Sequence, residues 1–165
     1  MIKKVLLLAA VILPMLASAQ TLKIGIVDTN DVLLSLPETA ANDKVLQEMS
    51  QKYQAEYKNL TDELERQYKD FQAMGDNELP AIRERKAQEL QNTQQKIQAF
   101  EQNAMTDLQK KQEELMTPVL QKVKSAIESV GKEGGYSLIQ EAAGQLYYAS
   151  PVEDITPLVK AKLGL

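Results

Sequence analysis

Carboxylates are the main groups in this sequence that could do chemistry, because it contains no Cys and no His. The chain therefore lacks thiol nucleophiles, disulfides, imidazole bases and the usual zinc ligands. Paired carboxylates alone can cleave glycosides, but they need a walled pocket, and the sequence has only two Phe and no Trp to build one. We expect a protein that is not an enzyme and has no cofactor or metal; a hydrolase based on carboxylates is the least favoured interpretation.

The start of the chain has the pattern of an export signal. Lys3 and Lys4 precede an apolar run over residues 5–16, and Ala17-Ser18-Ala19 fits a small-residue cleavage site. We predict a signal peptide over 1–19 and a mature chain that starts at Gln20. No other apolar run approaches the roughly 18 residues of a membrane-spanning helix, so we expect a soluble exported protein without stable membrane insertion.

The mature chain is predicted to be moderately acidic. Removal of Lys3 and Lys4 leaves 17 basic and 23 acidic residues, a net charge of −6. Nucleic-acid binding relies on clustered Lys and Arg, so we expect no nucleic-acid partner.

Two long helices dominate the predicted structure. Residues 22–27 alternate as a half-buried strand does, and 31–34 can form one helical turn. Ser35-Leu36-Pro37-Glu38 then has the form of a capping box at the start of a helix over 36–74. The chain reverses at a tip near 75–80, where Gly75-Asp76-Asn77 combines a helix stop with a new cap.

The second helix is predicted from about Glu78 to Val130, where Gly131 and then Gly134-Gly135 stop it. At a rise of about 1.5 Å per residue, the two helices would reach about 58 and 80 Å. These lengths exceed a compact domain of this size, so the helical hairpin is expected to protrude.

The apolar positions of the first helix predict how the hairpin packs. They are separated by steps of three, four and four residues, a pattern that repeats every eleven residues and has a period close to that of a straight helix. The predicted seam, with possible client contacts, comprises Met49, Tyr53, Tyr57, Leu60, Leu64, Tyr68 and Phe71, preceded by Leu46. On the second helix the rhythm runs from Ile97 to Val130, but Glu101 and Gln112 occupy seam positions and predict a weakly packed outer half.

A small sheet is expected at the other end of the hairpin. Residues 136–140 and 145–149 resemble two strands joined by a turn at Gly144, and Thr156-Pro157 caps a helix through Leu163. With the first strand they would form a marginal core whose edges invite pairing with other copies. The residues predicted for this oligomer base are Leu22, Ile24, Ile26, Leu120, Ile127, Leu138, Leu146 and Tyr148.

The predicted fold class is thus α+β and mostly helical, with a long antiparallel coiled-coil-like hairpin inserted in a small β-rich oligomerisation base. The base would comprise 20–35 and 132–165, and the hairpin 36–131.

Several short segments together resemble the Skp or OmpH-like periplasmic chaperones of Gram-negative bacteria. They are the strand Leu22–Asp28 after the signal, the Ser35–Glu38 helix start, Glu133–Ile139, and Leu146–Ala149 followed by Asp154-Ile155-Thr156. The resemblance covers the whole mature length. It implies a periplasmic homotrimer whose hairpins surround a cavity and hold unfolded outer-membrane β-barrel proteins without ATP.

The charge of the tip departs from this family, whose familiar members are strongly basic. Residues 65–90 hold five basic and six acidic side chains, so no lipopolysaccharide or anionic-lipid site is carried over. Two interpretations of the hairpin stay open: a holdase that prevents aggregation of its clients, and a structural coiled-coil spacer or adaptor of the cell envelope. The spacer predicts a dry, tightly packed seam, which Glu101 and Gln112 disfavour.

The tyrosines of the predicted seam, Tyr53, Tyr57 and Tyr68, suit contacts with unfolded clients, but their register favours packing between the two helices. The methionines are likewise better explained as fillers of an irregular seam than as a binding surface.

Overall fold

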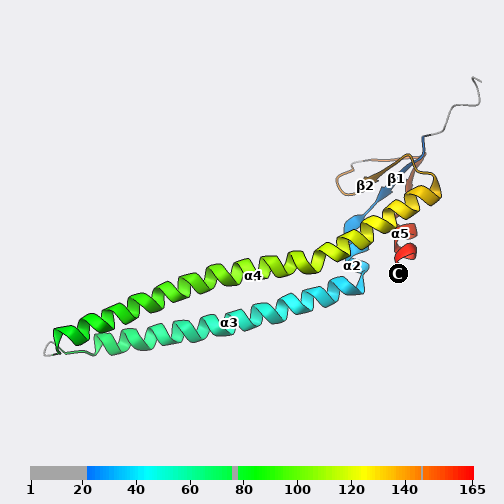
Figure 1. Cartoon of the computed structure of the whole chain (residues 1–165). Coiled ribbons are helices and arrows are strands. Elements are labelled where there is room, and N and C mark those ends of the chain that lie inside the picture. Colours follow the sequence, from blue (N-terminus) through cyan, green and yellow to red (C-terminus); the bar gives the residue numbers. More distant parts are fainter. Residues whose placement is uncertain (1–21, 76–77, 146) are drawn as a thin grey trace, which may run out of the picture. The chain divides into compact units, whose positions relative to one another are not determined.

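A computed structural model describes residues 22–75, 78–145 and 147–165. The predicted signal peptide, residues 76–77 of the predicted tip and Leu146 lie outside these residues. The elements follow one another as β1 (Ile24–Val27), α2 (Thr29–Ser35), α3 (Pro37–Gln72), α4 (Pro80–Gly134), β2 (Leu138–Glu141), β3 (Val152–Asp154) and α5 (Thr156–Leu163) (Figure 1). The predicted fold class, mostly helical with a long hairpin and a small sheet, is confirmed.

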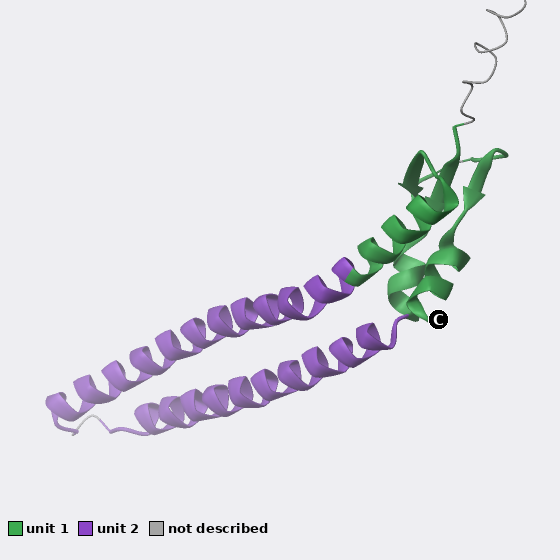
Figure 2. Cartoon of the chain, turned by 45° about the vertical axis from the view of Figure 1, so that its right-hand side comes forward, with its two compact units in different colours: residues 1–35, 122–165 green, residues 36–121 purple. Residues whose placement is uncertain are grey.

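The chain divides into two compact units (Figure 2). One, here called the base, has residues 22–35, 122–145 and 147–165 as its described part. The other, here called the hairpin, spans Leu36–Gln121 and contains α3 with most of α4.

The sheet of the base is parallel, with β1 between β2 and β3. The predicted hairpin of C-terminal strands is therefore wrong. β2 overlaps the first predicted run but extends to Glu141, whereas Tyr147, Tyr148 and Ala149 are not in a strand, and the third strand is Val152–Asp154 instead. Its place is fixed by pairing with β1 and by Ile155, which is fully buried and whose N–H donates to the Ile26 carbonyl at 2.8 Å.

The core of the base combines residues from both ends of the chain. Its fully or nearly fully buried apolar side chains come from the sheet and all three adjoining helices: Ile26, Val27, Val32, Val123, Ala126, Val130, Ile155 and Val159. Thr156 links the same parts, because its hydroxyl accepts a hydrogen bond from the Asp28 N–H at 2.9 Å. The terminal helix α5 ends at Leu163 as the sequence predicted, but the predicted cap at Thr156-Pro157 is wrong, because the N-cap is Ile155 and makes no side-chain hydrogen bond.

Several of the predicted element ends differ in the structure, including that of α3, which ends at Gln72 rather than residue 74. The first strand starts at Ile24 rather than Leu22, and α4 starts at Pro80 rather than about Glu78. The capping box is also wrong: Leu36 is the N-cap of α3 without a side-chain hydrogen bond, while the Ser35 hydroxyl donates to the Asp31 carbonyl inside α2. Pro37 does open the helix, as predicted.

Gly131 does not stop the second helix, which continues to Gly134. The helix stops at Gly135, which takes a positive φ of 65°. There the Tyr136 N–H donates to the Gly131 carbonyl, and the Gly135 N–H donates to the Lys132 carbonyl. This is a Schellman motif, which satisfies the last carbonyls of a helix. Gly131 instead lies close to Ile139 of β2: a Cβ there would meet the Ile139 Cδ1 at 2.9 Å.

Candidate functional site

The seam between α3 and α4 is formed by side chains that meet in antiparallel order. Asn42 Nδ2 donates to the Leu115 carbonyl at 3.0 Å, the Tyr53 hydroxyl to Asp107 at 2.9 Å, and the Thr93 hydroxyl to Gln67 Oε1 at 2.9 Å. Polar contacts thus recur along the seam.

An open apolar groove of about 530 Å³ lies along this seam. Tyr53 and Phe100 form its aromatic part, with an edge-to-face contact at 5.8 Å between ring centroids. Met105, which is 73 % exposed, and Tyr57, which is 39 % exposed, also line it. The complete lining is Ser50, Tyr53, Gln54, Tyr57, Phe100, Glu101, Ala104, Met105 and Leu108.

Two carboxylates orient the tyrosines of the groove. A hydrogen bond to Glu101, together with the negative charge of that group and partial burial, raises the pKa of Tyr57. The hydrogen bond to Asp107 is likewise the main cause of the raised pKa of Tyr53, followed by partial burial and the charge of Asp107. Both hydroxyls therefore stay protonated near neutral pH and donate to these carboxylates.

The predicted seam residues differ widely in exposure. Leu60 is buried, Met49, Tyr53, Leu64 and Phe71 are half-buried, and Tyr57 and Tyr68 are exposed. On α4, Ile97, Ala104 and Val119 are buried, whereas Glu101 and Gln112 are exposed. The structure brings Tyr53 and Tyr57 together in the groove and leaves Tyr68 outside it.

The predicted base residues fall into two groups within the described chain. Ile26 belongs to the core, and Ile24 and Ile127 are half-buried. Apolar side chains that remain exposed are Leu22, Leu138 and Tyr148 in the base and Leu120 in the hairpin. Leu138 lies on β2, which is an edge strand.

A cluster of charged and aromatic groups joins the sheet to the end of α4. Lys23 Nζ lies 4.0 Å from the centroid of the Tyr136 ring and 3.3 Å from Glu153, and donates to the Gly134 carbonyl at 3.2 Å. The Tyr136 hydroxyl also donates to Glu153. The hydrogen bonds from Tyr136 and Lys23 hold the pKa of Glu153 below its usual value. The polar groups of this cluster are already paired with one another. The cluster therefore stabilises the base and is no candidate for ligand chemistry.

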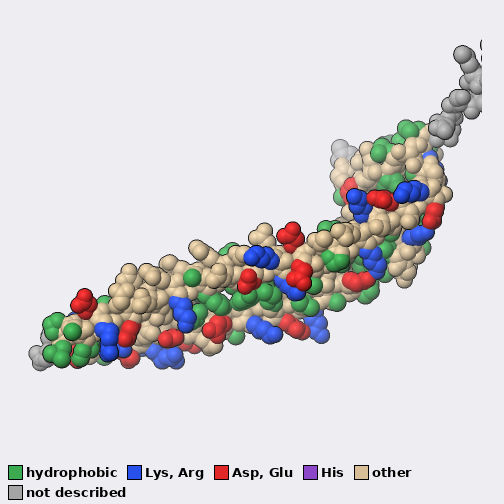
Figure 3. Space-filling model, in the orientation of Figure 1, with side chains coloured by type: hydrophobic (Ala, Val, Ile, Leu, Met, Phe, Trp, Pro, Cys, Tyr) green, Lys and Arg blue, Asp and Glu red, His purple; other side chains and the backbone are tan. Residues whose placement is uncertain are grey.

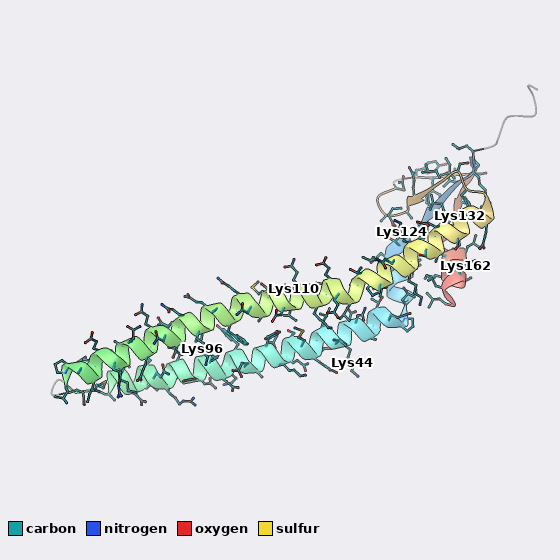
Figure 4. All side chains as sticks on the ribbon, viewed as in Figure 1. Lys44, Lys96, Lys110, Lys124, Lys132 and Lys162 are labelled. Atoms are coloured by element: carbon teal, nitrogen blue, oxygen red, sulfur yellow. The ribbon has the colours of Figure 1, made fainter. Side chains whose placement is uncertain are left out.

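Charge is distributed unequally between the two units. The hairpin has 16 acidic and 11 basic residues, a net charge of −5, whereas the described base has 7 acidic and 6 basic residues, a net charge of −1. Acidic and basic side chains interleave along the hairpin on the face shown in Figure 3. Its lysines are spread along both helices, with Lys44 on α3 and Lys96 and Lys110 on α4 (Figure 4).

The sequence interpretation missed Phe100 and Thr93, and it took Met105 as a filler of the seam although this side chain is exposed. Phe100 lies three residues after Ile97 and four before Ala104, so the same rhythm of threes and fours could have included it. Thr93 is buried in the seam although it is polar, because Gln67 satisfies its hydroxyl. Nothing in the periodicity marks Met105 as an exposed apolar side chain.

Within residues 22–75, 78–145 and 147–165, the carboxylates form no group of three or more that could hold a metal ion. In the same part of the chain, no helix is both long enough and apolar enough to cross a membrane.

Comparison with known proteins gives concordant results. The family model described as outer membrane protein (OmpH-like) matches residues 23–163. The chain is 29 % identical over 144 residues to the chaperone protein Skp of Yersinia enterocolitica, with 85 % of each protein covered. It also shares its fold with the crystal structure of an OmpH-like protein from Caulobacter crescentus CB15, at a TM-score of 0.73 and 18 % identity, covering 88 % of this chain and 86 % of that one.

Proposed function

Because the chain belongs to the OmpH-like outer membrane protein family, we propose that it is a periplasmic chaperone that binds unfolded outer-membrane proteins. It acts as a holdase: it prevents aggregation of its clients during transit and uses no ATP. The observation that carries the proposal is the family match, which spans nearly the whole mature length, with the similarity to Skp in support.

The hairpin supports this function in physical terms. It exposes a shallow apolar groove and scattered apolar side chains rather than an enclosed pocket. Many weak contacts of this kind gain affinity when one unfolded chain engages several of them together. The exposure of Tyr57 and Met105 is also less compatible with the spacer alternative, which requires a dry and closed seam.

Self-association into a homotrimer is the second part of the proposal. β2 is an edge strand with Leu138 exposed, and Leu22 and Tyr148 add exposed apolar surface in the base. An unpaired edge with apolar side chains is a template for pairing with another chain. Copies joined through their bases would place several hairpins around one client.

The function is tested with the mature protein and an unfolded outer-membrane β-barrel protein. When the client is diluted from denaturant, light scattering should fall as the chaperone is added and should be suppressed at a stoichiometric ratio, without ATP. Scattering that does not respond to the protein would refute the holdase.

Native mass spectrometry of the same mixture tests the assembly. We expect a trimer that takes up one client; a monomer that ignores the client would contradict both parts of the proposal. A stable complex with a folded envelope protein, together with no client binding, would favour the spacer.

A further inference from the structure

Because the groove combines aromatic faces with a single acidic side chain, we propose that it binds client segments in which an apolar residue lies next to Lys or Arg. This inference rests on the proposed function and names the kind of segment that the groove selects. It concerns the groove lined by Tyr53, Tyr57, Phe100, Glu101 and Met105.

The apolar half of such a segment would be held by surface that the hairpin leaves uncovered. Met105 and Tyr57 are exposed at the groove, and Tyr53 with Phe100 provides a rigid aromatic wall. Met adapts its shape to different partners, whereas the aromatic pair loses little conformational freedom on binding. The groove thus accepts varied apolar side chains.

The charge at the groove determines which neighbours of that apolar side chain are accepted. Glu101 is the one charged residue among those that line it, and the carboxylate of Asp107 bonds the hydroxyl of Tyr53 beside it. The hairpin as a whole carries a net charge of −5. A cationic neighbour would meet a carboxylate and ring faces, which both attract it; an acidic neighbour would be repelled.

The hairpin already contains one contact of this kind. Arg83 of α4 lies over the Phe71 ring of α3, 5.7 Å from its centroid. A Lys or Arg of a client would make the same type of contact with Tyr57 or Phe100.

This selection matters for the proposed clients because strands of outer-membrane barrels alternate apolar and polar residues. In an extended segment, each apolar side chain is therefore flanked by polar ones, and the groove would distinguish segments by the sign of those neighbours. The contacts depend on charge at an exposed surface, so the selectivity should weaken as salt is added.

The test uses two fluorescent peptides of equal length with the same Leu and Phe residues and with either Lys or Glu between them. Fluorescence anisotropy with the mature full-length protein at low salt should show the Lys peptide bound about threefold to tenfold more tightly. Glu101→Gln should weaken binding of the Lys peptide about threefold and should not weaken binding of the Glu peptide. Met105→Gln should weaken both peptides equally.

Glu113→Gln is the matched control, because it removes the same charge from an exposed position of α4 that does not line the groove. Equal binding of the two peptides, or equal effects of Glu101→Gln and Glu113→Gln, would overturn the inference. Helix content measured by circular dichroism shows that each variant is folded, as expected for substitutions at exposed positions.

Client aggregation is measured in parallel to separate the two proposals. Suppressed aggregation without peptide preference would refute the selectivity of the groove and leave the holdase standing. A preference for the Lys peptide without suppression of client aggregation would support the selectivity of the groove and refute the holdase function.

Discussion

The base and the hairpin differ in how they are held together. In the base, Val32, Ile155 and Val159 are completely buried around a three-stranded sheet. In the hairpin, buried Leu60, Ile97 and Ala104 alternate along one seam with polar contacts and an open groove. The larger set of buried apolar side chains thus lies in the smaller unit, whereas the open apolar groove lies in the larger one.

Truncation of a buried side chain to Ala should give the largest difference between the units in lost free energy of unfolding. Ile155→Ala removes a fully buried side chain and should destabilise the base by about 3 kcal/mol, whereas Leu60→Ala should cost the hairpin about 2 kcal/mol or less. Hydrogen exchange followed by mass spectrometry would measure the free energy of opening of each unit in each variant. A larger loss for Leu60→Ala would reverse the comparison.

Alanine substitutions at Gly134 and Gly75 should give a difference in stability of intermediate size. A Cβ at Gly134 would overlap the Tyr136 ring, whereas a Cβ at Gly75 would meet none of the described residues within 4 Å. Gly134→Ala should therefore destabilise the base by about 1–3 kcal/mol, because the ring that carries the Lys23 and Glu153 contacts must move. Gly75→Ala should change stability by less than about 0.5 kcal/mol. Urea unfolding curves would show the difference, and equal shifts of the two midpoints would contradict it.

The smallest expected effect is the loss of stability of the base at acidic pH. The pKa of Glu153 is lowered in the folded base by hydrogen bonds from Tyr136 and Lys23, relative to a usual value of 4.5. A lowered carboxyl pKa adds stability above the unfolded pKa, and this stability is lost as the pH falls through the folded pKa. The midpoint temperature of thermal unfolding should therefore decrease as the pH is lowered below 4.5, and it should decrease less in Glu153→Gln. An identical pH profile for that variant would mean that the cluster does not contribute; Glu113→Gln serves as the charge-matched control.

The sequence predicted the hairpin well because helix periodicity is a local property. The spacing from Leu46 to Phe71 and Pro37 at the helix start suffice to place α3. The predicted hairpin of 136–140 with 145–149 was wrong because strand pairing depends on tertiary contacts. Tyr147 and Tyr148 have high β-propensity but stay exposed outside any strand. β3 contains Glu153 and Asp154 and only one apolar residue, so its own sequence does not indicate a strand.

The candidate groove was only partly predictable. The rhythm of the seam placed Tyr53 and Tyr57 correctly on the face toward α4, but it cannot show where the seam stays open. That depends on the sizes of facing side chains, here Ala104 beside Met105 and Phe100, and therefore on the pairing of the two helices.

The strand order has a consequence for folding during synthesis. β1 lies between β2 and β3, so both of its neighbours are made only after the whole helical excursion. As the chain leaves the ribosome, β1 has no partner strand until nearly the last residues have emerged, while the local contacts of α3 can already form. Chains that terminate early would carry the helices but no completed sheet. If copies associate through the base, only finished chains would assemble.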